Sequence, residues 1–180
     1  MTSTVFTVSL SPTHGFSKAI TTEITLLIGQ GVEGDAHCGV TVKHRSRVKQ
    51  DPTQPNLRQI HLIHSELFQE LADKGFSVAP GALGENICTS GIALLELPVD
   101  TELRFGQSAV IKLTGLRNPC AQIDQYQPGL LPAVLSRTAE GELVRIAGVM
   151  AVVIQGGVVR PGDSISTQLP SKPHKKLERV

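Results

Sequence analysis

The stretch "ELVRIAGVMAVVIQGGVVRPGDSI", residues 142–165, indicates most directly which fold class this chain adopts. Its apolar residues come in short runs rich in Val and Ile, which favour extended backbone because their branched side chains pack well on a pleated surface. The runs are interrupted at Gly156–Gly157 and at the turn sequence "RPGD" (160–163). The stretch therefore predicts several short strands separated by tight turns.

Short apolar segments of the same kind occur upstream. "ITLLIGQGVEGD" (24–35) reads as a strand that enters a Gly-rich turn, and "RQIHLI" (58–63) as a strand. "ENICTSGIALLEL" (85–97) predicts two short strands around a turn, and "TELRFGQSAVIKLTG" (101–115) predicts two more around Gly106. Many short strands with few helices indicate a mainly β (α+β) protein, built as a closed or nearly closed barrel with a few short helices.

Two segments predict helices. In "HSELFQELADKG" (64–75), Leu67, Phe68 and Leu71 form an apolar face, and Ser65 can cap the first turn. "GLLPAVLSR" (129–137) predicts a second, shorter helix.

The chain length of 180 residues suits one domain, which we place at 1–167. The polar segment "VKHRSRVKQDPTQPN" (42–56) contains two prolines and predicts a loop. The remaining 168–180 are basic and contain prolines, so we expect a disordered tail there.

Composition excludes several classes of function. A formal net charge of +1 and an aromatic content of 3% argue against a nucleic-acid-binding protein or a membrane-surface protein. The N-terminus does not resemble a signal peptide, and the longest apolar run, "VMAVVI" (149–154), is too short to span a bilayer. Three cysteines without an export signal predict reduced thiols in a cytoplasmic protein.

One cysteine stands in an unusual setting. "GLRNPCAQIDQYQPG" (115–129) places Cys120 after Arg117, Asn118 and Pro119, at a point where a strand ends and a helical turn is predicted to begin. A nearby guanidinium and the free amides of a helix start both favour a thiolate over a thiol, and the thiolate is the form that attacks sulfur or binds soft metals. The alternative is that Cys120 is a small buried hydrophobe, as many free cysteines are.

The other candidate ligands have stronger structural explanations. Cys88 lies in a predicted strand and fits the core. Cys38, with His37 and His44, could suggest a metal site, but adjacent residues of an extended chain point to opposite sides and the spacing matches no common zinc pattern. His61 and His64 fall across a strand-to-helix junction and are best interpreted as hydrogen-bonded structural histidines.

Basic residues are concentrated in one segment. Between residues 43 and 58 there are six basic side chains, Lys43, His44, Arg45, Arg47, Lys49 and Arg58, against the single acid Asp51. This local excess could be a solvated surface or could bind a phosphate or a carboxylate. The Gly-rich turns "GQGVEGD" and "PGALGEN" offer open backbone amides suited to the same task, although neither matches a known nucleotide-binding motif.

Five segments, in order, resemble the MOSC domain, the module found at the C-terminus of molybdenum cofactor sulfurases and as small stand-alone proteins. They are "GVEGDAHCG", "RQIHLIHSEL", "PGALGENICTSGIALLELP", "GLRNPC" and "GGVVRPGDSI", and together they span about residues 24–165. The resemblance implies a strand-rich, barrel-like fold and binding of a molybdopterin-type cofactor. In that family the late cysteine is thought to carry sulfur as a persulfide or to contact the molybdenum, and the matching residue here is Cys120.

The resemblance also implies which residues shape the pocket. The family's Gly-Asp-x-His segment matches Gly34, Asp35 and His37, and its Gly-Glu-Asn segment matches Gly84, Glu85 and Asn86. For the cofactor phosphate, the basic candidates are Arg45, Arg47, Arg58 and Arg117, with Asn118 beside them. No segment resembles the pyridoxal-phosphate desulfurase domain of the sulfurases, so we expect no pyridoxal phosphate in this chain.

Three interpretations remain open at this stage. The first is a molybdenum cofactor binding protein in which Cys120 carries sulfur or binds molybdenum, with a cysteine desulfurase or a molybdoenzyme as partner. The second is a molybdenum-dependent reductase of N-hydroxylated compounds that receives electrons from a separate protein. The third is a non-enzymatic barrel that binds a small anion or a protein.

Overall fold

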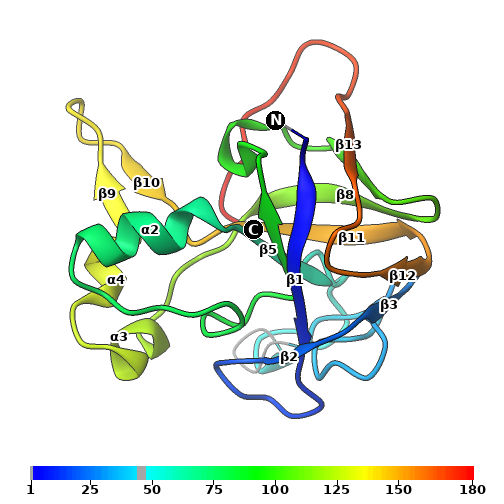
Figure 1. The fold of residues 1–180 in the computed structure, drawn as a ribbon, viewed down its shortest axis with the longest axis horizontal. Coiled ribbons are helices and arrows are strands. Elements are labelled where there is room, and N and C mark those ends of the chain that lie inside the picture. The colour runs from blue at the N-terminus through cyan, green and yellow to red at the C-terminus, as the bar shows by residue number, and fades with distance from the viewer. Residues whose placement is uncertain (1, 44–47) are drawn as a thin grey trace.

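The computed structural model describes residues 2–43 and 48–180. Strands dominate it, and the helices are short (Figure 1). The strands are β1 (Thr4–Leu10), β2 (Ala19–Thr21), β3 (Ile24–Leu27), β4 (Gly31–Val32), β5 (Ile60–His64), β6 (Ile87–Ser90), β7 (Glu102–Phe105), β8 (Ala109–Leu116), β9 (Leu135–Arg137), β10 (Leu143–Arg145), β11 (Val149–Gln155), β12 (Gly157–Val159) and β13 (Ile165–Gln168). The helices are α2 (Glu66–Asp73), α3 (Gln122–Tyr126), α4 (Leu130–Ala133) and the 3₁₀ turn η1 (Leu94–Glu96).

Eight strands form the main sheet, in the order β13-β7-β8-β11-β5-β6-β1-β2. All its neighbouring strands run antiparallel except β5 and β6, which are parallel and register Leu62 against Ile87. Helix α2 lies in the connection between β5 and β6, because parallel neighbours need a crossover. Two smaller sheets, β12-β3-β4 and β10-β9, complete the architecture, so the prediction of a mainly β protein is confirmed.

The barrel part of the prediction is not confirmed, because the described strands form no closed ladder. The main sheet ends at β13 on one side and at β2 on the other. The start of β1 does approach the start of β13: Val5 N–H donates to the Asp163 carbonyl (2.9 Å) and Ile165 N–H to the Ser3 carbonyl (2.8 Å). These bonds bring the first and last strands together without continuing as a paired ladder.

Strand β5 is buried on both faces, which explains its continuous apolar character. Leu62 packs into the core between the sheets with Ile87, Phe105 and Ile111. The adjacent Ile63 points to the opposite side, into a second apolar cluster that α2, α3 and α4 cover. The strand therefore separates two cores, and the residues at its edges are held by packing on both sides.

The local predictions are mostly confirmed, with three differences. The helix predicted over 129–137 is limited to α4, and Leu135–Arg137 form strand β9. Residues 94–96 form the 3₁₀ turn η1 instead of a second strand after Gly91. Ser65 does occupy the N-cap position of α2, but its backbone is helical and its hydroxyl makes no capping hydrogen bond. Glu66 instead accepts from the backbone N–H of Gly91 (2.8 Å), which ties the helix start to the end of β6.

The structure corrects the prediction of a disordered tail at 168–180. Gln168 completes β13, and the segment beyond it returns to the body of the protein. Leu177 is 8% exposed and packs in the main core, while Leu116 N–H donates to the Glu178 carbonyl (2.7 Å). Composition missed this because one buried leucine and backbone hydrogen bonds hold a segment that is otherwise polar.

The helices in the described ranges are all short, and none is long and apolar enough to cross a membrane.

Candidate functional site

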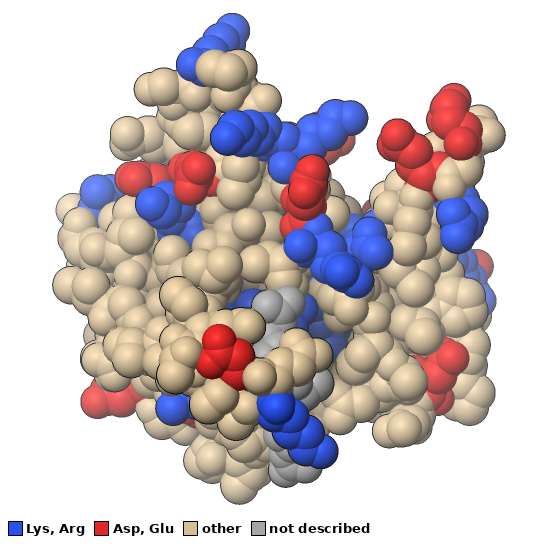
Figure 2. Space-filling view, turned by 180° about the vertical axis from the view of Figure 1, so that it is seen from behind, with Lys and Arg blue, Asp and Glu red and all other residues tan. Residues whose placement is uncertain are grey.

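A cavity of about 570 Å³ lies where segments from distant parts of the sequence meet. Figure 2 shows the face behind that of Figure 1, with Lys and Arg side chains around a central hollow. The cavity is lined by the loop before β2, residues near the start and inside β5, the segment before β6, the residues that follow β8 and a residue close to the C-terminus. The cavity therefore forms only where these distant segments come together.

Positive charge dominates the lining. Five cationic side chains line the cavity, and among the described residues no Asp or Glu does so. They are Lys18, Lys43, Arg58, Arg117 and Arg179. A cavity with this lining favours an anionic ligand.

Arg117 follows β8 directly, and its backbone N–H donates to the Gly148 carbonyl (3.0 Å). Its guanidinium lies 5.9 Å from the centre of the Phe16 ring, and its Nη1 is shielded from solvent without a hydrogen-bond partner among the described residues. Burial lowers the pKa of Arg117, an effect that nearby Cys120 and Glu85 partly offset. A buried donor without an acceptor costs free energy, so Nη1 is available to donate a hydrogen bond to a further acceptor.

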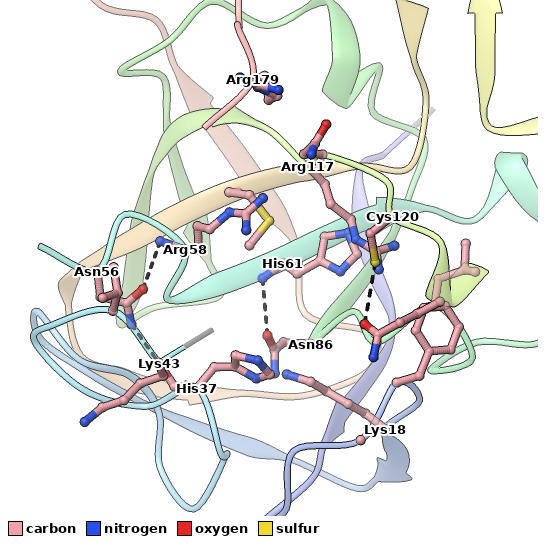
Figure 3. Close-up of a pocket in the computed structure, with 18 of the residues that line it drawn as sticks. Lys18, His37, Lys43, Asn56, Arg58, His61, Asn86, Arg117, Cys120 and Arg179 are labelled. Carbon is pink, nitrogen blue, oxygen red and sulfur yellow. Dashed lines mark hydrogen bonds between the residues drawn. The ribbon is translucent and has the colours of Figure 1, made fainter. Parts of the chain in front are cut away.

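Cys120 lines the same cavity, near Arg117 (Figure 3). It is partly exposed, and its Sγ–H donates to Oε1 of Gln122 at 3.5 Å. The sequence predicted that helix-start amides would face this sulfur, but α3 begins at Gln122 and the Cys120 carbonyl, not its sulfur, accepts from Ile123 N–H (3.0 Å). Of the two predicted influences on the sulfur, only the guanidinium lies beside it.

A buried ion pair holds one wall of the cavity. Lys18 Nζ lies 2.7 Å from Asp35 Oδ2, and the two side chains are 4% and 2% exposed. Burial alone would raise the pKa of Asp35, but hydrogen bonds from His37 and the charge of Lys18 outweigh it and hold the pKa well below its usual range. Burial lowers the pKa of Lys18, against the opposing effect of Asp35.

Asp35 also orders its own turn. It accepts from His37 N–H (2.9 Å) and from Ser11 N–H (3.2 Å), while the preceding Gly34 has a φ of +76° that side-chain-bearing residues rarely adopt. Gly34 itself lies on the surface outside the cavity. The Gly-Asp-x-His segment thus places Lys18 and His37 at the cavity wall, with Asp35 buried behind them.

Asn86 joins three elements with one side chain. Its Oδ1 accepts from His61 N–H (3.2 Å), and its Nδ2 donates to the Ser9 carbonyl (3.3 Å) and to Asp35 Oδ2 (3.2 Å). The neighbouring Glu85 is buried outside the lining and accepts from Gly81 N–H, whereas its second oxygen has no partner among the described residues. Burial raises the pKa of Glu85.

His61 is a buried histidine at the cavity wall. Its Nε2 lies 2.8 Å from the Ala147 carbonyl, which identifies that nitrogen as the protonated one. Burial, followed by the nearby charge of Arg117, lowers the pKa of His61 well below its usual value. The imidazole is therefore neutral, and it adds a polar group to the cavity without adding charge.

The predicted site residues divide into three groups. The cavity brings together His37, Arg58, Asn86, Arg117, Asn118 and Cys120. Gly34, Asp35 and Glu85 do not line it. Arg45 and Arg47 lie outside the described residues.

The metal site considered at Cys38, His37 and His44 is not tested as a set, because His44 lies outside the described residues. In the described ranges 2–43 and 48–180, no three Cys, His, Asp or Glu side chains gather in a way that could hold a metal ion.

Comparison with known proteins identifies the family. The sequence profile of the MOSC domain matches residues 41–166, more than half of the chain. The chain belongs to the MOSC domain family. MOSC domains are associated with binding of the molybdenum cofactor. A search among curated proteins returned no match.

Solved structures share the fold of this MOSC protein. The YuaD protein from Bacillus subtilis has a TM-score of 0.76 at 26% identity, over 95% of this chain and 98% of its own. YiiM from Geobacillus stearothermophilus has a TM-score of 0.68 at 18% identity, over 97% and 79% of the two chains. YiiM from Escherichia coli has a TM-score of 0.62 at 20% identity, over 97% and 73%. The two YiiM structures show similarity of fold alone.

Three cavity residues of this MOSC protein carry no clear signal in the sequence. Lys18 stands alone in an N-terminal loop, and Arg179 belongs to the segment expected to be disordered. His61 was expected to be a hydrogen-bonded structural histidine, because His61 and His64 fall across a strand-to-helix junction; its Nε2 does bond to the Ala147 carbonyl, and the residue also lines the cavity. The alternation of β5 offered a clue to His61, because it places residue 61 on the opposite face from Leu62.

Proposed function

We propose that this protein binds a molybdopterin-type cofactor in the cavity and presents Cys120 to it as the sulfur contact. One observation carries the proposal: a cysteine thiol and a buried arginine with a free donor lie in the same cation-lined cavity. The cofactor would supply the redox chemistry of molybdenum, while the chain binds and orients it.

The residues present fit the charge of such a group. Its phosphate needs hydrogen-bond donors, and the free Nη1 of Arg117 is one that no described residue satisfies. Lys43 and Arg58 add positive charge to the lining. Lys18 contributes less, since Asp35 already neutralises it. An anion at Arg117 would also offset the cost of burying that guanidinium.

The thiol of Cys120 suits contact with the molybdenum of such a cofactor. Thiolate sulfur is a soft ligand, and Cys120 lines the cavity near the Arg117 guanidinium. To reach a ligand, the thiol must release its proton and its bond to Gln122, which at 3.5 Å is a weak contact.

Cys120 can alternatively carry sulfur. The thiolate would attack the terminal sulfur of a persulfide on a cysteine desulfurase, forming the Cys120 persulfide as the donor S–S bond breaks and the donor thiolate leaves. The exchange needs no external oxidant or reductant. A desulfurase would then be a partner protein, and a molybdoenzyme would be the acceptor.

The test is cofactor content. Protein purified from a cofactor-producing host is analysed for molybdenum by mass spectrometry and for pterin by fluorescence after oxidation. We expect both in the wild type, a large loss of molybdenum in Cys120→Ser, and no loss in Cys38→Ser. Cys38 is the matched control because it is also partly exposed but does not line the cavity.

Two results would separate or reject these roles. Equal molybdenum in wild type and Cys120→Ser would reject ligation by this sulfur. Sulfur carriage would then be tested by incubating the protein with a desulfurase and cysteine, and intact-mass analysis should find one added sulfur atom on wild type and on Cys38→Ser but not on Cys120→Ser. Absence of pterin and of the added sulfur would reject the proposed function.

A further inference from the structure

The segment 175–180, which we call the C-terminal strap, lies across the end of β8. The Lys175 carbonyl accepts from Val99 N–H (3.0 Å), and Val180 N–H donates to the Leu116 carbonyl (3.2 Å). Between them, Leu177 is buried in the main core. The strap is therefore fixed at three points, and its last residues pair with the strand that leads to the cavity.

Gly115 makes this close approach possible. A Cβ placed on Gly115 would lie 2.5 Å from the Glu178 carbonyl oxygen and 2.8 Å from the Cβ of Val180. Only glycine leaves room for the strap at this position of β8. The glycine and the strap fit each other as two parts of one packing arrangement.

The strap brings a second arginine to the cavity. Arg179 forms a parallel bridge with Leu116, the residue immediately before Arg117, and its side chain lines the cavity. Figure 3 shows Arg179 at the upper edge of the cavity, while the Arg117 side chain extends from its backbone toward His61 and Cys120. Within the described residues Arg179 makes no ion pair, so its charge is not neutralised by a neighbouring carboxylate.

We propose that Arg179 is a ligand-binding residue of this cavity, which acts together with Arg117 to bind the phosphate group of the ligand. Arg117 supplies a hydrogen-bond donor that is shielded from solvent, and Arg179 supplies a solvent-exposed guanidinium from the strap. Two guanidinium groups from neighbouring chain positions suit a group with two negative charges. The inference rests on the proposed function for the identity of the ligand as a pterin phosphate, but the recognition of phosphate can be tested without it.

The experiment measures binding of inorganic pyrophosphate to the full-length protein by titration calorimetry at low salt. We expect Arg179→Ala to weaken binding by about tenfold or more, the effect of losing one charge-assisted contact. The affinity of Arg179→Lys should lie between those of wild type and Arg179→Ala, because lysine keeps the positive charge but cannot form the two parallel hydrogen bonds of a guanidinium. Lys176→Ala is the matched control, since it removes an exposed charge from the same strap outside the cavity lining.

A second variant separates the strap from the side chain. Gly115→Ala keeps Arg179 in the sequence but displaces the strap, so it should weaken pyrophosphate binding as much as Arg179→Ala does. Arg179→Ala should leave the thermal midpoint unchanged, which distinguishes lost recognition from lost folding.

Three outcomes would overturn the inference: no pyrophosphate binding to wild type, binding by Arg179→Ala equal to that of wild type, or an equal loss in Lys176→Ala. If purified protein lacks molybdenum and pterin but binds pyrophosphate in an Arg179-dependent way, the cofactor proposal fails and this inference stands. If the wild type contains the cofactor, and Arg179→Ala retains both the cofactor and full pyrophosphate binding, the cofactor proposal stands and this inference fails.

Discussion

The buried pair of Lys18 and Asp35 allows the placement of the cavity wall to be tested by stability. Asp35→Asn keeps the shape of the side chain but leaves the Lys18 ammonium buried without a counter-charge. Removal of one partner from a buried pair costs about 3–5 kcal/mol. For a chain of this size each kcal/mol lowers the thermal midpoint by roughly 2–4 °C, so we expect a decrease of about 6–20 °C.

An exposed ion pair in the same protein provides the control. Arg160 Nη2 lies 2.6 Å from Glu23 Oε2, as close as the buried pair, but these side chains are 56% and 47% exposed. Glu23→Gln should therefore cost no more than about 1 kcal/mol. The contrast between the two substitutions isolates the effect of burial, because the distances are nearly the same.

Thermal unfolding followed by circular dichroism gives the midpoints of both variants, and urea denaturation gives their free energies of unfolding. Since the pKa of Asp35 is lower in the folded state than in the unfolded one, its contribution is present above about pH 4 and is lost as the pH falls through the folded-state pKa. The penalty of Asp35→Asn should accordingly shrink in strong acid. The double variant Lys18→Met/Asp35→Asn should recover part of the loss, because no unpaired charge remains. A loss in Asp35→Asn no larger than that in Glu23→Gln would refute the buried pair.

Three further substitutions or modifications test other parts of the structure. Burial raises the folded-state pKa of Glu85, so its ionisation opposes folding as the pH rises above about 4. In urea titrations between pH 4 and 8, Glu85→Gln should therefore gain stability relative to wild type as the pH rises. A stability difference that does not change with pH would contradict the burial of Glu85. Gly115→Ala should make the C-terminal segment accessible to trypsin, and unchanged digestion would show that the segment does not pack there. A maleimide should label Cys38 and Cys120 but not Cys88 in native protein, as read by peptide mass spectrometry, because only Cys88 is buried; rapid labelling of Cys88 would contradict the packing of β6.

The fold class followed from the sequence because short Val- and Ile-rich runs between glycines have few alternatives to strands. Residues 149–155 and 157–159 are strands that separate at Gly156, as the glycine pair predicted. The order of strands could not be read in the same way. The parallel pairing of β5 with β6 depends on contacts between distant residues, and no local pattern encodes them.

The site was only partly predictable for the same reason. Cys120 and Arg117 are close in sequence, so their setting was visible as a motif. Lys18 gains its place from Asp35, 17 residues away, and Arg179 gains its place from Leu116. Glu85 and Asn86 were recognised as a segment, but only the structure separates the buried carboxyl from the amide that reaches the cavity.

The dispersal of the cavity residues along the chain affects when the protein can first hold a ligand. During translation Lys18 is synthesised early, His61 and Arg117 later, and Arg179 last of the four. Since the lining is complete only when Arg179 has docked beside β8, the cavity is incomplete through most of translation. Ligand uptake should therefore follow synthesis of the strap rather than accompany it, and a stalled chain that ends before residue 177 should remain empty.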